Sequence, residues 1–190
     1  MEQLKERLNK IIPRITSADF LDSTGLGNEI AFYIFDYPPE KELEIRKHIK
    51  FIPGHLKKKK PELRIKHINL FELIINNLKD NNFLDRAIKL QKEKGNESLL
   101  KALKGLLNGK KVAEIFVKEA DPDNHDLVLI SGVGSVWPLL RSHSLLNNLH
   151  PLMADTPLVM FYPGIYSSLD LRLFGRLDQK NYYRAFRLVP

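Results

Sequence analysis

Two glycines, a serine, an arginine and a histidine follow an apolar run in the stretch "SGVGSVWPLLRSH", residues 131–143. Glycines after a strand can expose backbone N–H groups to a phosphate, which is the chemistry of a nucleotide loop. A P-loop also needs Lys and then Ser or Thr after its last glycine. Here "SVW" follows Gly134, and no Lys occurs before Met153. The dinucleotide fingerprint G-x-G-x-x-G fails as well, because its third glycine would fall at Trp137.

The same glycines suit a tight turn between a strand and a helix. Gly132 and Gly134 let the backbone turn sharply after the apolar run. Ser135 is expected to cap a helix whose first turn contains Pro138. We therefore interpret Gly132, Gly134 and Ser135 first as a structural turn.

Three polar side chains of the predicted helix are the candidates for binding a partner protein. Arg141 and His143 cannot share one helical stripe, whereas His143 and Asn147 can. The side chains of an active site converge on one point, so a diverging set favours a protein surface. Arg is also enriched at interface hot spots. We propose Arg141, His143 and Asn147 as partner-binding residues.

The sequence offers no motif for catalysis or metal binding. It has no Cys, which excludes thiol catalysis, Cys-ligated zinc and disulfides, and no H-E-x-x-H pair or G-x-S-x-G elbow occurs. Glu29 and Asp36 flank one apolar run and could be paired carboxylates, although their positions are more typical of a turn residue and a strand-end cap. We expect no catalytic residue, no cofactor and no metal.

One basic segment carries the whole formal charge of the protein. The net charge is +7, and residues 41–66 hold ten Lys or Arg against three Glu. Such a segment can contact phosphates or an acidic partner. The run Lys57, Lys58, Lys59 and Lys60 is the candidate for a weak, sequence-independent DNA contact, and the alternative is a solvated helix end.

The elements that position these residues alternate between apolar strands and helices. Helix patterns occupy 2–12, ending before Pro13, then 39–52, broken or kinked at Pro53, and 138–149. Residues 71–119 are helical throughout and are interpreted as a helical insertion, with Gly95 and Gly109 as C-caps. Strand patterns lie at 30–37, 64–70, 127–131 and 158–164, with a C-terminal pair at 169–175 and 182–189. The sequence predicts a single α/β domain over 1–190, with a mostly parallel, Rossmann-like sheet flanked by helices.

The N-terminus and the apolar runs bear on localisation. "MEQLKERLNKIIPRI" mixes charges with apolar residues and lacks the apolar core of a secretory signal. No apolar run approaches the roughly 20 residues that span a bilayer. We expect a cytoplasmic protein with no membrane partner.

Four stretches, taken in order, resemble one protein family, namely "GLGNEIAFYIFDY", "SGVGSVWPLLRSHSLLNNL", "MFYPGIYSSLDLRLFG" and "NYYRAFRLVP". They are similar to the BrxB family of BREX bacteriophage-exclusion systems, a family of unknown biochemical function, and the match runs from about residue 20 to the C-terminus. The resemblance implies a phage-defence component that works beside an ATPase, an adenine methyltransferase and an alkaline-phosphatase-like protein, and it supplies no catalytic residues.

The residues and the resemblance together predict a non-enzymatic adaptor that binds other BREX proteins. Two alternatives stay open. One is a degenerate nucleotide-binding sensor or enzyme that uses the 131–143 loop. The other is a non-specific DNA-binding accessory factor that uses the 41–66 segment, with DNA contacted weakly by that segment or through the complex.

Overall fold

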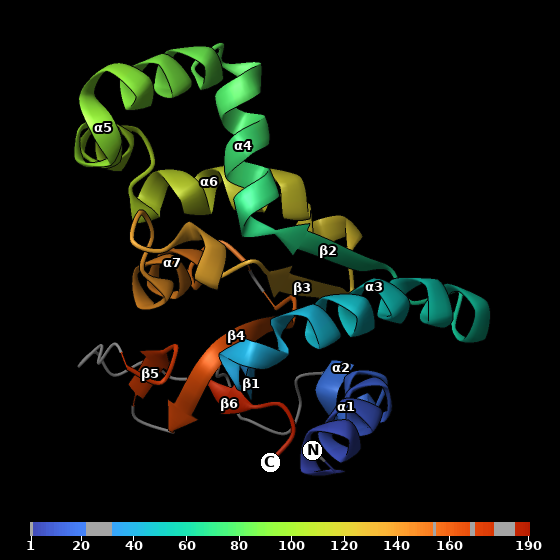
Figure 1. Ribbon diagram of the computed structural model, residues 1–190. Coiled ribbons are helices and arrows are strands. Elements are labelled where there is room, and N and C mark those ends of the chain that lie inside the picture. The colour runs from blue at the N-terminus through green and yellow to red at the C-terminus, as the bar shows by residue number, and fades with distance from the viewer. Residues whose placement is uncertain (1, 22–31, 154, 168–169, 177–184) are drawn as a thin grey trace.

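A mostly parallel sheet runs through the middle of the molecule (Figure 1). The computed structural model describes residues 2–21, 32–153, 155–167, 170–176 and 185–190. Within them, parallel strands lie in the order β2, β3, β4, β1, β6, and β5 pairs antiparallel with the end of β4. The bounds are β1 (Phe32–Tyr37), β2 (Ile65–Asn69), β3 (Leu127–Ser131), β4 (Leu158–Ser167), β5 (Asp170–Leu173) and β6 (Phe186–Arg187).

The central strands are buried on both faces because their side chains alternate between two apolar clusters. In β1, Phe32 and Ile34 belong to one cluster, and Tyr33 and Phe35 belong to the other. Every residue of β1 and of β3 is buried. Strands of this kind read as continuous apolar runs, which is why the sequence predicts them well.

Helices cover the two faces of the sheet. One cluster contains buried residues of α1 (Glu2–Ile15), α2 (Ala18–Leu21) and α3 (Glu42–Lys59). The other contains buried residues of α4 (Leu70–Asp80), α6 (Gly109–Ala120) and α7 (Ser142–Leu149). α5 (Leu84–Leu106) has no fully buried residue and lies away from the sheet (Figure 1). These layers confirm the predicted α/β fold with its helical insertion between β2 and β3.

Two prolines that were expected to end or break helices lie inside them. α1 continues past Pro13 to Ile15, and α3 continues past Pro53 to Lys59. A proline inside a helix loses one backbone hydrogen bond. Ile15 and Leu56, beyond the two prolines, are buried in the core. Burial of these apolar residues therefore stabilises the helix beyond each proline.

Of the two glycines predicted to end helices, one interrupts a helix and the other begins one. Gly95 has φ 79° and ψ 177° and divides α5 into two helical halves. Gly109 is the first residue of α6, and Asn108 before it is the N-cap, whose side chain accepts from the Lys111 N–H at 3.0 Å. The C-cap prediction for Gly109 is therefore wrong. None of the described helices is long and apolar enough to cross a membrane.

Candidate functional site

Close contacts hold the loop that follows β3. Gly132 has φ +74°, and a Cβ built on it would lie 2.3 Å from Oδ1 of Asn69. That oxygen is fixed, because it caps α4 by accepting from the Phe71 N–H at 3.0 Å. A Cβ on Gly134 would lie 2.9 Å from the ring of Phe174. The loop thus packs tightly against the end of β2 and against the turn after β5.

The helix expected to start near Pro138 starts later in the chain. The 3₁₀ helix η4 (Gly134–Val136) follows the glycines, and α7 begins at Ser142 with Arg141 in the N-cap position and in extended conformation. Residues five apart point to different sides of an unbroken helix. The break at Arg141 therefore allows Leu140 and Leu145 both to be buried. Ser135, the expected cap, instead accepts from Nη2 of Arg46 on α3 at 3.4 Å.

A pocket of about 430 Å³ opens beside the start of α7. One wall comes from the connection between β3 and α7 and from α7 itself, and the other comes from the end of α5 and the start of α6. We call it the Trp137 pocket. Its lining residues are Lys104, Asn108, Gly109, Trp137, Pro138, Leu139, Leu140, Arg141, His143 and Ser144.

The structure brings two of the three predicted partner-binding residues together. Arg141 and His143 both line the Trp137 pocket. They were expected to diverge as members of one helix, but Arg141 precedes α7 and its direction is not set by helical stripes. Asn147, which is exposed on α7, does not line the pocket.

The Trp137 pocket combines an exposed aromatic ring with cations. Trp137 is 41 % exposed and is the single Trp of the sequence. Lys104 and Arg141 line the pocket, and no Asp or Glu is among its lining residues. Trp and Arg are the residue types most enriched at interface hot spots. The lining of the pocket therefore combines positive charge with an exposed apolar ring.

His67 and Ser131 form the contact that comes nearest to a catalytic pair. Nε2 of His67 lies 2.8 Å from Oγ of Ser131, across the ends of β2 and β3. Ser131 is only 6 % exposed, so its oxygen is poorly placed to attack a substrate. Burial lowers the pKa of His67, which favours a neutral ring. The pair ties two strands together. Among the described residues, no group of three or more His, Asp or Glu could hold a metal ion.

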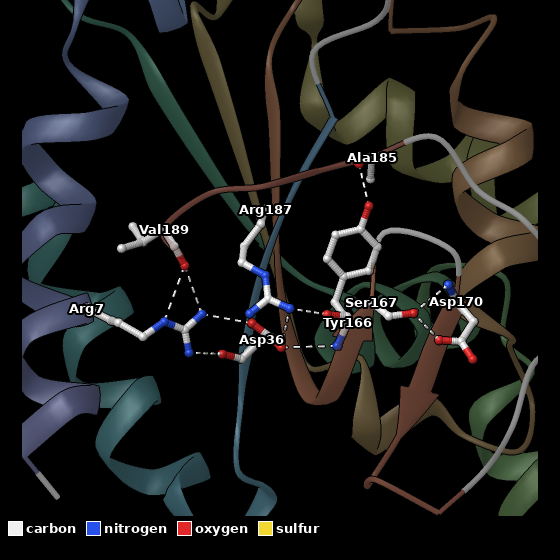
Figure 2. Close-up of polar contacts among 8 residues, drawn as sticks. All are labelled: Arg7, Asp36, Tyr166, Ser167, Asp170, Ala185, Arg187 and Val189. Carbon is white, nitrogen blue, oxygen red and sulfur yellow. Dashed lines mark hydrogen bonds and ion pairs between the residues drawn. The ribbon is translucent and has the colours of Figure 1, made fainter.

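A buried carboxylate joins α1, β1, β4 and the last described residues of the chain (Figure 2). Oδ1 of Asp36 lies 2.8 Å from Nη2 of Arg7, and Oδ2 accepts from the Tyr166 N–H at 3.1 Å. Nη2 of Arg187 lies 3.6 Å from the same Oδ2. Arg7 also donates to the Val189 carbonyl at 3.0 Å. Each charge of this cluster is matched by a partner, which is how a protein holds buried charges.

Asp36 is therefore the centre of an ion cluster and not a strand-end cap. Its side chain points to cations from α1 and β6 and to a backbone N–H of β4, so it closes the sheet against α1 (Figure 2). Glu29, its predicted partner in a carboxylate pair, lies outside the described residues. The sequence carried a signal for this role, because an acid inside an apolar run needs a cation nearby.

The basic segment contains both exposed and engaged cations. Lys57, Lys58 and Lys59 are exposed in the last turn of α3, where the helix dipole favours positive charge. Lys60 is half-buried and donates to the Thr16 carbonyl at 3.1 Å. Only part of the segment's charge is therefore open to a nucleic acid. Four other cations of the segment are in ion pairs, Lys41 with Glu44, Arg46 with Glu42, Arg64 with Asp126 and Lys66 with Glu119.

The sequence interpretation missed two residues of the Trp137 pocket. Trp137 stands inside the stretch that drew attention, and a lone exposed Trp is itself a signal for an interface. Lys104 gave no signal, because it comes from the helical insertion and reaches the pocket only through the packing of α6 against α7.

These features define a class of protein, an α/β domain with a mostly parallel sheet flanked by helices, in which a tightly packed loop follows β3. A family model described as "BREX protein BrxB" matches residues 66–188. The chain belongs to the BrxB family.

Two relatives match nearly the whole chain, and both are described as "BREX protein BrxB". One, from Bacillus cereus (strain H3081.97), is 42% identical over 193 residues, which cover 100% of this chain and 99% of that protein. The other, from Escherichia coli O9:H4 (strain HS), is 42% identical over 187 residues, covering 98% of this chain and 92% of that protein. No solved structure matches the chain.

Proposed function

We propose that this chain is a non-enzymatic component of a BREX phage-defence system and acts as an adaptor between other BREX proteins. The Trp137 pocket docks an acidic surface of one of them. The candidates are the ATPase, the adenine methyltransferase and the alkaline-phosphatase-like protein of the system. Family membership supports the BREX setting, and the lining of the pocket supports the adaptor role.

One observation carries the proposal, namely that Trp137 and Arg141 line one pocket whose lining contains no Asp or Glu. An indole ring that is 41 % exposed leaves much of its apolar surface in water, and a partner that covers it gains the stabilisation of that burial. The guanidinium of Arg141 adds bidentate recognition of a carboxylate. An anchor ring beside a cation is a common arrangement at the centre of an interface.

The variant Arg141→Ala tests this role. Loss of an Arg at a hot spot costs about 2 kcal/mol or more of binding free energy, which is a drop of about 30-fold in affinity. We expect weaker co-purification with another BREX protein from a strain that carries the intact defence cluster, and reduced phage protection, at an unchanged melting temperature. Arg86→Ala, at an exposed Arg of α5 outside the pocket, is the matched control.

Two outcomes would contradict this use of the Trp137 pocket. If Arg141→Ala unfolds the protein, the side chain is structural. If complexes and protection survive both Arg141→Ala and Trp137→Ala, the interface lies elsewhere. Alanine variants of His143 and Asn147, both on α7, test how far the proposed interface extends beyond Arg141.

A second candidate function is a weak, sequence-independent DNA contact, which the exposed lysines Lys57 to Lys59 support. The affinity should then fall with salt at a slope of about −0.9 per phosphate contacted. Glu at all three positions should abolish retention on DNA. Glu at the exposed Lys92, Lys94 and Lys101 of α5 makes the same change in charge and should leave retention intact. Unchanged retention in the first variant would remove this function.

A further inference from the structure

β2 forms an open edge of the sheet. It pairs with β3 from Ile65 to Asn69 and stands at the end of the strand order. Within the described residues, no strand lies on its other side (Figure 1). An open edge offers backbone N–H and C=O groups to a further strand, and most proteins cover or blunt such an edge.

Alternate residues of β2 direct their backbone groups off this edge. The Arg64 N–H donates to the Asp126 carboxylate at 2.8 Å, and the Arg64 carbonyl accepts from the Asp126 N–H at 2.8 Å, so both groups point toward β3. Because backbone groups alternate sides along a strand, those of Ile65 and His67 lie on the outer side. The outer side therefore presents a short ladder for pairing.

A groove of about 340 Å³ borders the C-terminal half of β2 and is lined by residues of β2, α4 and α6. We call it the β2 groove. His67 and Asn69 contribute to it from the strand. Glu72, Asn76 and Asp80 line it from α4, four residues apart and hence on one helical face. An Asn amide both donates and accepts, so Asn76 is suited to bonding a peptide backbone.

The β2 groove is acidic on a basic protein. Glu72, Asp80 and Glu119 line it, against Lys118 as the cation of the lining. Glu119 is already paired with Lys66 at 2.7 Å. Asp80 is exposed in the last turn of α4, where the helix dipole disfavours a carboxylate, and no ion pair involves it within the described residues. Stability of the helix therefore does not account for Asp80, whereas a basic ligand does.

We propose that the β2 groove binds an extended peptide segment with Lys or Arg side chains, which adds as a strand to the outer edge of β2. The main chain of the segment bonds to Ile65 and His67, and a basic side chain reaches Asp80 and Glu72. In this mode of recognition, backbone bonds provide affinity and side-chain contacts provide specificity. The proposal rests on the proposed function only in that the segment belongs to another BREX protein.

Short overlapping peptides that span the other proteins of the same BREX cluster are the probe, bound to the full chain and read by fluorescence anisotropy. We expect binding by peptides that combine β-branched residues with Lys or Arg. Asp80→Lys should weaken it about tenfold, because an attraction becomes a repulsion. Glu97→Lys, the same change at an exposed acid of α5, should leave it unchanged.

A second pair of variants tests the backbone pairing. Ile65→Pro removes an N–H that faces outward without removing a bond to β3, and edge strands tolerate such prolines. Ile65→Ala removes the same side chain but keeps the N–H. We expect the Pro variant to lose peptide binding and the Ala variant to keep it. If Ile65→Pro fails to fold, slower hydrogen exchange at Ile65 and His67 in the peptide complex of the unchanged protein replaces this test.

The proposal is overturned if no peptide binds, if Asp80→Lys and Glu97→Lys bind alike, or if the amides of β2 exchange equally fast with and without a bound peptide. If no peptide binds but Arg141→Ala still weakens co-purification, only the proposal for the β2 groove is refuted. If peptides bind but Arg141→Ala leaves co-purification unchanged, only the proposal for the Trp137 pocket is refuted.

Discussion

Asp36→Ala should lower the free energy of unfolding by about 3 kcal/mol, because it leaves buried cations without their carboxylate. The side chain of Asp36 is 9% exposed and that of Arg7 is 14% exposed. Removal of one partner from a buried pair costs about 3–5 kcal/mol. Arg7 keeps its bonds to the carbonyls of residue 36 and Val189, so the lower end of that range applies.

The melting temperature followed by circular dichroism measures this cost. In a chain of this size, about 1 kcal/mol corresponds to roughly 2–4 °C, so Asp36→Ala should melt about 6–12 °C lower. Asp126→Ala is the matched control. Asp126 pairs with Arg64 at 2.6 Å, but the two side chains are 33% and 53% exposed. An exposed pair contributes about 0.2–1 kcal/mol, so the control should shift by no more than about 4 °C.

Equal shifts in Asp36→Ala and Asp126→Ala would refute the reasoning from burial. A double-mutant cycle with Arg7→Ala then locates the energy. We expect Arg7→Ala to cost less in the Asp36→Ala background than in the unchanged protein, because the pair is already broken. A strictly additive cycle would mean that Asp36 stabilises the fold mainly through its other partners, the N–H of Tyr166 and the guanidinium of Arg187.

Three further outcomes follow from the loop and from the half-buried His67. Gly132→Ala should lower the free energy of unfolding in urea by about 1–2 kcal/mol, because Gly132 has a positive φ. Gly54→Ala should raise the free energy of unfolding, because an added Cβ meets open space there. The opposite order would contradict the strain argument. Calorimetry should detect no tight magnesium-dependent ATP binding, and micromolar binding that Gly134→Val abolishes would revive the nucleotide sensor. Burial lowers the pKa of His67 below its unfolded value, so stability should fall as pH drops below about 6.5. If His67→Gln leaves this dependence of stability on pH unchanged, other groups cause it.

The fold was predictable from the sequence because its strands are buried on both faces. The runs at β1, β3 and β4 are almost wholly apolar, and helical patterns separate them, which is typical of a parallel sheet. The order of the strands was not predictable in the same way. β1 and β2 are consecutive in the chain but lie apart, with β3 and β4 between them, and only tertiary packing decides that.

Helix ends were predicted less well, because local rules compete with packing. Pro13 and Pro53 carry a local signal to stop, yet the apolar residues beyond them are buried and extend the helices. The ion cluster of Asp36 shows the same limit. Its arginines, Arg7 and Arg187, lie near opposite ends of the sequence, so no local spacing could have joined them.

The Trp137 pocket depends on how closely α6 approaches α7. A Cβ on Gly109 would lie 2.2 Å from Oγ of Ser144. The start of α6 therefore packs this closely against the first turn of α7 because residue 109 has no side chain. A larger residue at position 109 would require the Ser144 side chain to move. Lys104 and Trp137 line the pocket that lies beside this contact. A local pattern cannot tell a glycine that ends one helix from a glycine that lets the next one pack closely, because the deciding atom lies in a distant segment. Arg141 forms part of the pocket wall because α6 packs against α7. The stretch of sequence around Arg141 does not specify that packing.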